Sequence, residues 1–160
     1  MKSFHTIAAL TLALLASPVF GATCSASASG VSLGTYTPNQ AAPADSAGSI
    51  VVVCTKGALD TLPMTVNYSV NINRGGSASY SPRDMTNGTN ALHYNLYRDA
   101  VRINIWGDTT GGTSNVTGAL VLQPTPGSAT GTHTVYGRVF ASQNAVPGAY
   151  ADSIVVTVSY

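Results

Sequence analysis

Strict alternation along residues 153–160 constrains the fold of this chain more than any other feature. One face of an extended strand would carry Ile154, Val156, Val158 and Tyr160, and the other would carry Ser153, Val155, Thr157 and Ser159. This period of two predicts a β-strand, because successive side chains of a strand point to opposite faces. An apolar strand must either lie inside a sheet or leave an edge for another chain to pair with. We therefore expect a β-protein in which this strand borders an edge that needs a partner.

The same alternation recurs along the chain and predicts further strands. They cover residues 25–33, with a kink at Gly30, and residues 48–54, 64–72, 92–97, 101–105, 119–122 and 132–140. Residues 82–90 and 109–118 are rich in turn-forming side chains and predict loops. No amphipathic helical pattern follows residue 21. About seven or eight short strands, spaced by roughly ten residues, predict an all-β sandwich.

Residues 1–21 have the pattern of a secretory signal peptide. Lys2 supplies a positive start, residues 7–15 form a short apolar region, and Val19 and Gly21 occupy the positions before the cleavage site. We therefore predict cleavage before Ala22, which leaves residues 22–160 as the mature domain. The alternative of a retained membrane anchor is disfavoured, since about 20 apolar residues are needed to span a bilayer.

The chain has two cysteines, Cys24 and Cys54. In an exported protein an even pair predicts a disulfide. Closing a loop of about 30 residues would stabilise the fold by roughly 3–4 kcal/mol on the chain-entropy account. A metal site is disfavoured because no His, Asp or further Cys lies at ligand spacing from either residue. We expect the bond to staple the first predicted strand to the second.

Low charge narrows the possible partners. Charged residues make up 8% of the chain, against about 25% in a typical globular protein. Lys and Arg (7) and Asp and Glu (6) nearly cancel, so nothing points to nucleic acid or to an anionic membrane. Solubility would then depend on hydroxyl and amide side chains, which suits a subunit of an assembly.

Residues that could catalyse a reaction are few. Residues 22–160 contain no Glu, and their histidines are His93 and His133, for which we expect surface polar roles. Asp99, Asp108 and Asp152 sit at predicted strand ends, where turn capping is the ordinary role of a carboxylate. We therefore expect no enzymatic activity, no cofactor and no metal.

Eight short motifs occur in an order that resembles the spore coat protein U domain, a family that includes subunits of archaic chaperone–usher pili. The motifs begin with Cys24 followed at a distance by Gly34-Thr-Tyr36, which count as one motif, then the stretch from Gly48 to Cys54, and Arg83-Asp-Met85. They continue with residues 92–99, Trp106-Gly-Asp108, Thr134-Val-Tyr-Gly-Arg138, Gly148-Ala-Tyr-Ala-Asp152 and Val156-Thr-Val-Ser-Tyr160. The resemblance covers essentially all of residues 22–160, and its specificity comes from the order of the motifs rather than from any single one.

The resemblance implies an immunoglobulin-like sandwich that lacks its final strand. A periplasmic pilus chaperone would fill the gap first, and the N-terminal extension of a neighbouring pilus subunit would replace it at an outer-membrane usher. The implied groove residues are Ile154, Val156, Val158 and Tyr160 on one wall and Val31 and Leu33 on the other. The protein would leave through the periplasm and reside at the cell surface.

Two alternatives stay open. A spore-coat or other surface-coat protein would share the fold and the lack of catalysis. A tip adhesin for sugars or abiotic surfaces would need an exposed aromatic surface, although aromatic residues more often fill the core of a sandwich. The candidates for such a surface are Tyr80, Tyr94, Tyr97, Trp106 and Tyr136.

One departure from the family pattern concerns the segment before the first cysteine. Strand-donating subunits have an extension of about ten to fifteen residues there, as the family pattern implies. After cleavage before Ala22, only Ala22 and Thr23 would precede Cys24. Two residues span about 7 Å at most, which cannot fill a groove. We therefore expect a subunit that accepts a strand without donating one, at the tip of a fibre or as a minor component.

Overall fold

The computed structural model describes residues 21–57, 60–124 and 127–160. The predicted signal peptide lies outside the described residues except for Gly21. The described part of the chain forms eight β-strands and no helix. The strands are β1 (Ala22–Ala28), β2 (Ala44–Lys56), β3 (Met64–Ile72), β4 (Arg83–Asn87), β5 (Asn90–Tyr97), β6 (Val116–Leu122), β7 (Ser128–Val139) and β8 (Val156–Ser159).

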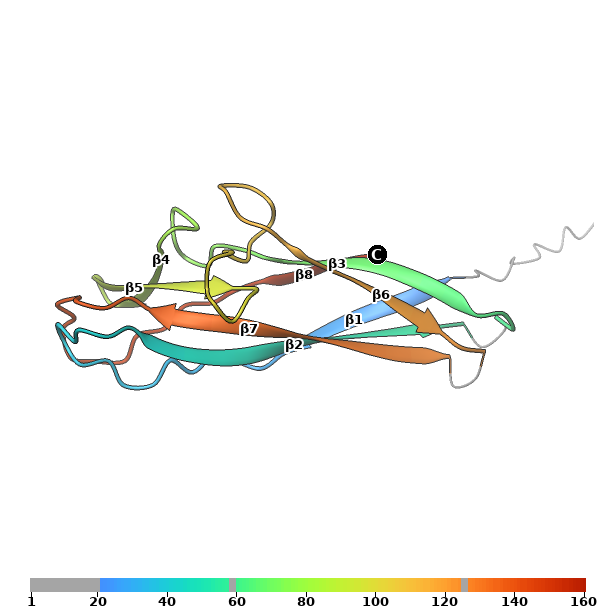
Figure 1. Cartoon of the computed structure of the whole chain (residues 1–160), viewed down its shortest axis with the longest axis horizontal. Coiled ribbons are helices and arrows are strands. Elements are labelled where there is room, and N and C mark those ends of the chain that lie inside the picture. Colours follow the sequence, from blue (N-terminus) through green and yellow to red (C-terminus); the bar gives the residue numbers. More distant parts are fainter. Residues whose placement is uncertain (1–20, 58–59, 125–126) are drawn as a thin grey trace, which may run out of the picture.

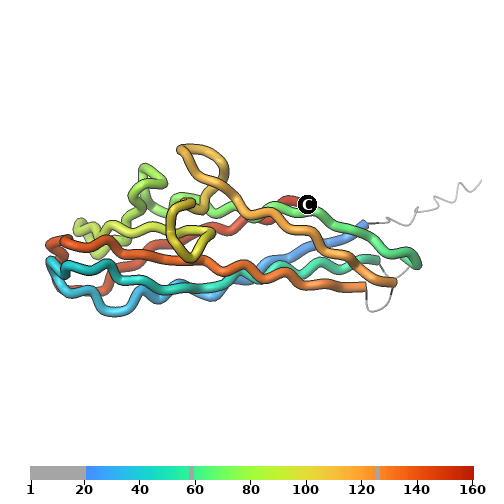
Figure 2. Tube along the Cα trace, in the orientation of Figure 1, coloured from blue at the N-terminus to red at the C-terminus, as the bar shows by residue number. Residues whose placement is uncertain are grey.

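The strands pair into two antiparallel sheets that lie face to face (Figure 1). One sheet has five strands in the order β1-β2-β7-β5-β4, and the other has three in the order β6-β3-β8. Figure 2 shows the elongated shape that results from the length of β2, β3 and β7. The structure confirms the predicted all-β sandwich. Within the described ranges, no helix has the length and hydropathy that crossing a bilayer requires.

The core lies between the sheets and follows the alternation of the sequence. In β3, Val66, Tyr68 and Val70 are buried, whereas the alternate residues Thr65 and Asn67 are exposed. Tyr80, Tyr94, Tyr97 and Trp106 are also buried, at 8%, 3%, 7% and 0% exposure. These aromatic residues therefore fill the core, as we favoured over a sugar-binding surface.

The disulfide prediction is confirmed, with Cys24 bonded to Cys54. The two residues are direct partners in the antiparallel pairing of β1 with β2, and Cys54 is fully buried. The bond therefore links an edge strand to the interior of the five-stranded sheet.

Removing this bond should destabilise the protein without altering any binding surface. We expect the Cys24→Ser/Cys54→Ser variant to lose about 3–4 kcal/mol of stability, which lowers Tm by roughly 10 °C and reduces the exported yield. Differential scanning calorimetry of the variant and of the reduced wild type would measure the loss. An unchanged Tm together with a normal yield would show that β1 is held by its hydrogen bonds alone.

Two predictions of local structure were wrong. Residues 82–90 were expected to be a loop, but β4 lies there and pairs with β5 in a tight hairpin. Residues 101–105 were expected to be a strand, but they form a turn in which the Asp99 carboxylate accepts the backbone N–H of Ile103 and of Asn104. Such side-chain bonds to the backbone compete with sheet pairing. As a result Ile103 is 75% exposed although its sequence context is that of a strand.

The ends of several further strands also differ from the prediction. Strands β2, β5, β6 and β7 begin two to four residues earlier than predicted, and β6 begins inside the predicted loop 109–118. The first strand ends at Ala28 rather than near Leu33, and β8 begins at Val156 rather than at Ser153. Thus Val31, Leu33 and Ile154 lie outside regular strands, on segments that flank β1 and β8.

A buried arginine organises the end of the sandwich near β4. Arg83 is fully buried, and its guanidinium donates hydrogen bonds to Asn95 Oδ1 (2.6 Å), the carbonyl of Trp106 (2.7 Å) and that of Asn73 (3.1 Å). Its Cζ also lies 5.0 Å from the centre of the Tyr80 ring. One side chain therefore ties together three segments that are distant in sequence.

Candidate strand-binding groove

Strand β8 is an edge strand whose pairing is one-sided. It pairs with β3 from Ile72 opposite Val156 to Ser69 opposite Ser159, and within the described residues no strand pairs with its other edge. Edge strands of this kind present a row of unpaired N–H and C=O groups. The free edge of β8 is therefore competent to add a further strand.

Residues 28–36 lie across the groove from Val156, the first residue of β8, and from the segment before it, and we call them the N-terminal wall. The last backbone bond that ties the wall to β2 runs from Ser29 N–H to the carbonyl of Ser49 (2.8 Å). Within the described part of the chain, residues 30–36 make no backbone–backbone hydrogen bond. Val31 and Leu33 are half-buried and pack against the core. The wall is thus a second run of unpaired backbone that is anchored by its side chains.

The C-terminal wall consists of residues 145–156, and the groove lies between the two walls. One cavity of about 380 Å³ lies between residues 28–33 and residues 150–156. A second of about 530 Å³ continues from it between residues 31–36 and 145–150. Both are lined by Val31, Leu33, Met85 and Tyr150, so they form one continuous groove.

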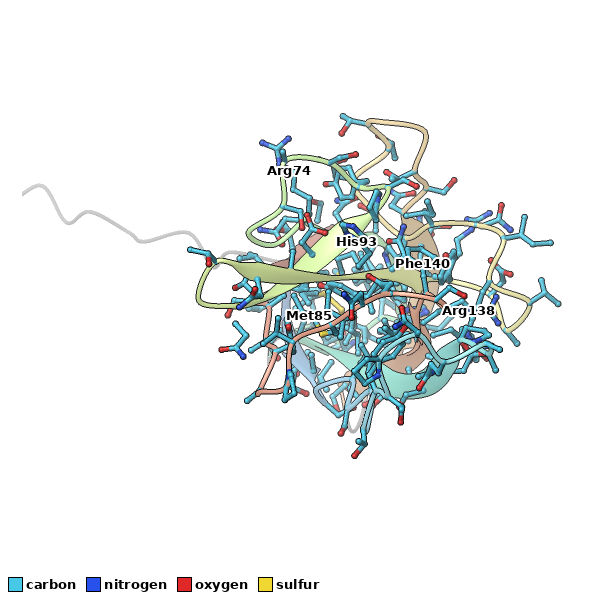
Figure 3. All side chains as sticks on the ribbon, turned by 90° about the vertical axis from the view of Figure 1, so that its left-hand side faces the viewer. Arg74, Met85, His93, Arg138 and Phe140 are labelled. Carbon is cyan, nitrogen blue, oxygen red and sulfur yellow. A yellow bond between two sulfur atoms is a disulfide. The ribbon has the colours of Figure 1, made fainter. Side chains whose placement is uncertain are left out.

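The floor of the groove is the hydrophobic core itself. Core residues that line it are Ile50, Ile72, Met85, Leu92, Tyr94, Leu96, Val135 and Val139. Figure 3, which looks along the long axis, shows Met85 among the side chains between the sheets, whereas Arg74 and Arg138 lie at the periphery. The groove is therefore an opening into the core rather than a depression on the surface.

Asp152 is the one acidic or basic side chain that lines the groove, and its oxygens are already engaged. Tyr94 OH donates to Oδ2 (2.6 Å), while the backbone N–H groups of Gly76 and Ser153 donate to Oδ1 (2.9 and 2.8 Å). Burial, and then the bond to Asp152, raise the pKa of the Tyr94 phenol. The carboxylate thus fastens the C-terminal wall to β5 and to the turn at Gly76.

An apolar floor between two walls that each include unpaired backbone can accept an extended peptide. Backbone hydrogen bonds to the walls would give affinity, and alternate side chains would enter the core. Among the described lining residues, the one carboxylate, that of Asp152, is already held by Tyr94 and by two backbone N–H groups. The groove therefore has the shape and polarity that an extended peptide requires.

The structure brings together four of the six groove residues named in the sequence. Val31, Leu33, Ile154 and Val156 line the groove. Val158 is half-buried against the core beyond the lining residues. Tyr160 is 58% exposed and borders a shallow depression with residues of β3 and β6.

The floor and the far end of the groove were not predicted. Met85 lies in the stretch expected to be a loop, and Tyr150 belongs to a motif whose side-chain directions the sequence left open. The half-buried alternation of residues 150, 152, 154 and 156 is the one signal that could have extended the C-terminal wall.

Side chains with catalytic potential lie apart from the groove. His93 and Asp84 form an exposed pair with 2.5 Å between Nδ1 and Oδ1. His133 Nε2 lies 2.9 Å from Tyr68 OH, and burial lowers the pKa of His133. In the part of the chain that the structure describes, no group of three or more His, Cys, Asp or Glu side chains could hold a metal ion.

The N-terminal wall contains a short serine motif. Gly30-Val-Ser-Leu-Gly34 has the Gly-x-Ser-x-Gly spacing of a nucleophile elbow, a signal for serine hydrolases that the sequence contains. An elbow requires its serine at a sharp turn from a strand into a helix. Ser32 instead lies in a segment that no helix follows within the described residues. The spacing therefore lacks the structural context of that motif.

Three comparisons place the chain among known proteins. The family model for the Spore Coat Protein U domain matches residues 10–157. Protein U of Myxococcus xanthus is 32% identical over 137 residues, which cover 81% of this chain and 71% of that protein.

A similar solved structure is the CsuC–CsuE chaperone–tip adhesion subunit pre-assembly complex from the archaic chaperone–usher Csu pili of Acinetobacter baumannii. The match has a TM-score of 0.56 and 20% identity, and it covers 87% of this chain. This chain spans about 40% of the length of the solved chain it matches. The likeness supports the sandwich fold.

Proposed function

The chain belongs to the Spore Coat Protein U domain family, and on this premise we propose that it is a non-enzymatic structural subunit of a pilus-type surface assembly. In this role the groove accepts a β-strand from a partner protein. A periplasmic chaperone occupies the groove before assembly, and the N-terminal strand of a neighbouring subunit occupies it afterwards at an outer-membrane usher. The same groove would serve a subunit of a surface coat.

The observation that carries this proposal is the apolar groove between the N-terminal wall and the C-terminal wall. Apolar surface in contact with water costs about 25 cal/mol per Å². The floor is itself buried, with Ile50, Ile72 and Leu96 at most 5% exposed, whereas Val31, Leu33 and Ile154 of the walls are only half-buried. An inserted strand would cover this surface and satisfy the free edge of β8 at the same time. A sandwich built in this way gains stability from a partner strand.

We further propose that this subunit accepts a strand but donates none. Strand β1 begins at Ala22, which is already paired with Lys56, and Thr23 is paired with Thr55. If cleavage occurs before Ala22, no residue remains ahead of β1 to reach another subunit. Such a subunit would cap a fibre or be a minor component. N-terminal sequencing of the exported protein tests this premise, and a mature chain that starts well before residue 21 would contradict it.

Co-expression tests the proposed function directly. We expect export of the chain together with a periplasmic chaperone to yield a one-to-one complex, and export without the chaperone to yield little soluble protein. The complex should transfer the chain to a subunit that carries a donor extension, whereas the chain by itself should form no polymers. A soluble, chaperone-independent monomer that binds no donor strand would contradict the strand-accepting role. Spontaneous polymers of the purified chain would contradict the acceptor-only role.

The burial of the candidate aromatic residues weakens the alternative that this protein is a tip adhesin. Four of the five aromatic residues that could have formed a sugar-binding surface are buried in the core. An adhesive function would have to use other residues.

A further inference from the structure

Two glycines of the five-stranded sheet lie directly beneath the N-terminal wall. A Cβ atom placed on Gly137 of β7 would lie 2.7 Å from Val31 Cγ1 and 3.0 Å from Leu33 Cδ2. A Cβ on Gly48 of β2 would lie 2.9 Å from the carbonyl oxygen of Ser29 and 3.0 Å from Val31 Cγ2. Glycine inside a strand is unfavourable by about 0.5–1 kcal/mol relative to alanine, and it often marks a site of close approach. Here the approaching group is the wall of the groove.

The wall has little else to hold it in place. Residues 30–36 lack backbone–backbone hydrogen bonds within the described part of the chain. Gly30 and Gly34 flank the two seated side chains, and a Cβ on either would meet no atom within 4 Å. Gly34 has a φ of +73°, a conformation that favours glycine. Farther along, the Tyr36 hydroxyl accepts the backbone N–H of Gln143 (2.8 Å). The distance between the N-terminal wall and the five-stranded sheet therefore depends on how closely the side chains of Val31 and Leu33 pack against that sheet.

We propose that Gly137 is a positioning residue that sets the width of the groove by seating Val31 and Leu33. This proposal rests on the proposed function and identifies what aligns its binding site. A strand inserted between the walls needs each wall about 4.7–4.9 Å away to form its hydrogen bonds. A methyl group on Gly137 pushes the N-terminal wall away from the five-stranded sheet. The backbone hydrogen bonds between this wall and the inserted strand then lose their favourable geometry. Val31 has little room to move aside, because its β-branched side chain is stiff at χ1 and its other methyl group, Cγ2, lies over Gly48.

A double-mutant cycle between Gly137 and Val31 tests this proposal. The probe is the chaperone identified by co-expression, and the readout is its Kd for each purified variant. We expect Gly137→Ala to weaken binding at least about 10-fold, and Val31→Ala to weaken it only a few-fold. The decisive result is the double variant. Because Val31→Ala removes the nearer of the two close contacts and leaves only the flexible end of Leu33 at 3.0 Å, Gly137→Ala should cause little further loss in that background.

The control for the glycine substitution is Gly57→Ala. A Cβ at Gly57 meets no atom within 4 Å, and the residue lies outside the groove lining. We expect this variant to bind like the wild type. Equal binding by the wild type and Gly137→Ala would overturn the seating role, and so would losses that simply add in the double variant. A wild type that binds no chaperone would instead overturn the proposed function.

The cycle is decisive even if Gly137→Ala does not fold by itself. In that case the Gly137→Ala/Val31→Ala protein should fold and bind the chaperone within a few-fold of Val31→Ala. Far-UV circular dichroism and Tm of each variant would report folding separately from binding. A double variant that also fails to fold would show that Gly137 serves the sheet rather than the wall, which overturns the proposal.

Discussion

Replacing Arg83 with methionine is expected to destabilise the protein by about 3–5 kcal/mol, more than the loss of any other single polar side chain. Methionine can occupy much of the same space, but it donates no hydrogen bond. The variant leaves the carbonyls of Trp106 and Asn73 without their arginine donor, and Asn95 Oδ1 keeps only the bond from the backbone N–H of Leu96 (2.9 Å). Each buried acceptor that loses its partner costs about 1–3 kcal/mol. Thermal unfolding should show a Tm lower by roughly 10–15 °C.

Arg74→Met is the matched control for this experiment. Arg74 is exposed and donates to the nearby carbonyl of Ala78, at the edge of the molecule (Figure 3). We expect its replacement to change stability by no more than about 0.5 kcal/mol. Arg83→Lys should rescue little, since an ammonium group cannot reproduce the planar fork of a guanidinium. An Arg83→Met protein within about 1 kcal/mol of the wild type would show that the three acceptors find other donors.

Replacing Val156 with aspartate is expected to abolish the complex with the chaperone. Val156 is half-buried, lines the groove and opens β8 opposite Ile72. A carboxylate there would face an apolar floor, and its burial under an inserted strand would cost several kcal/mol. We expect binding to weaken by at least about 100-fold, which corresponds to about 2.7 kcal/mol. Co-purification with the chaperone and titration by calorimetry would measure the loss.

The neighbouring residue provides a control with the same change in charge. Val155 precedes β8, is 59% exposed and does not line the groove. The Val155→Asp variant should therefore bind within about a few-fold of the wild type. If both aspartate variants lost binding equally, the effect would arise from the charge of the strand rather than from the groove. Normal co-purification of the Val156→Asp variant would remove this residue from the binding site.

Sequence patterns were reliable where the structure follows local alternation. The predicted strand 64–72 matches β3 at both ends, because its apolar residues are buried against one core and its polar residues are exposed. The same reasoning failed at residues 101–105. Val101 and Ile103 alternate with polar residues as in a strand, but the bonds to the Asp99 carboxylate fold this segment into a turn. A contact between a side chain and nearby backbone can thus override the period of two.

The buried arginine shows a different limit. A charged residue next to Pro82 and ahead of Asn87-Gly88 is typical of a loop, and its burial depends on acceptors supplied by Asn73, Asn95 and Trp106. Those acceptors are brought together only when β3 and β5 and the turn after β5 are in place. No window of the sequence around Arg83 contains them.

Periodicity and cysteine count by themselves determined that this chain is an all-β sandwich with a Cys24–Cys54 disulfide. Both features can be read directly from the sequence, because strands show as side-chain alternation and a single pair of cysteines leaves one possible disulfide. Only the tertiary structure decided which residues form the groove. Its walls are the segments beside β1 and β8, which lie at opposite ends of the chain, and its floor includes Met85 from a stretch that resembled a loop. The free edge of β8 likewise results from the sheet order β6-β3-β8. Sheet order arises from pairing between distant residues such as Ile72 and Val156, and a strand's own pattern carries no record of which of its edges remains unpaired.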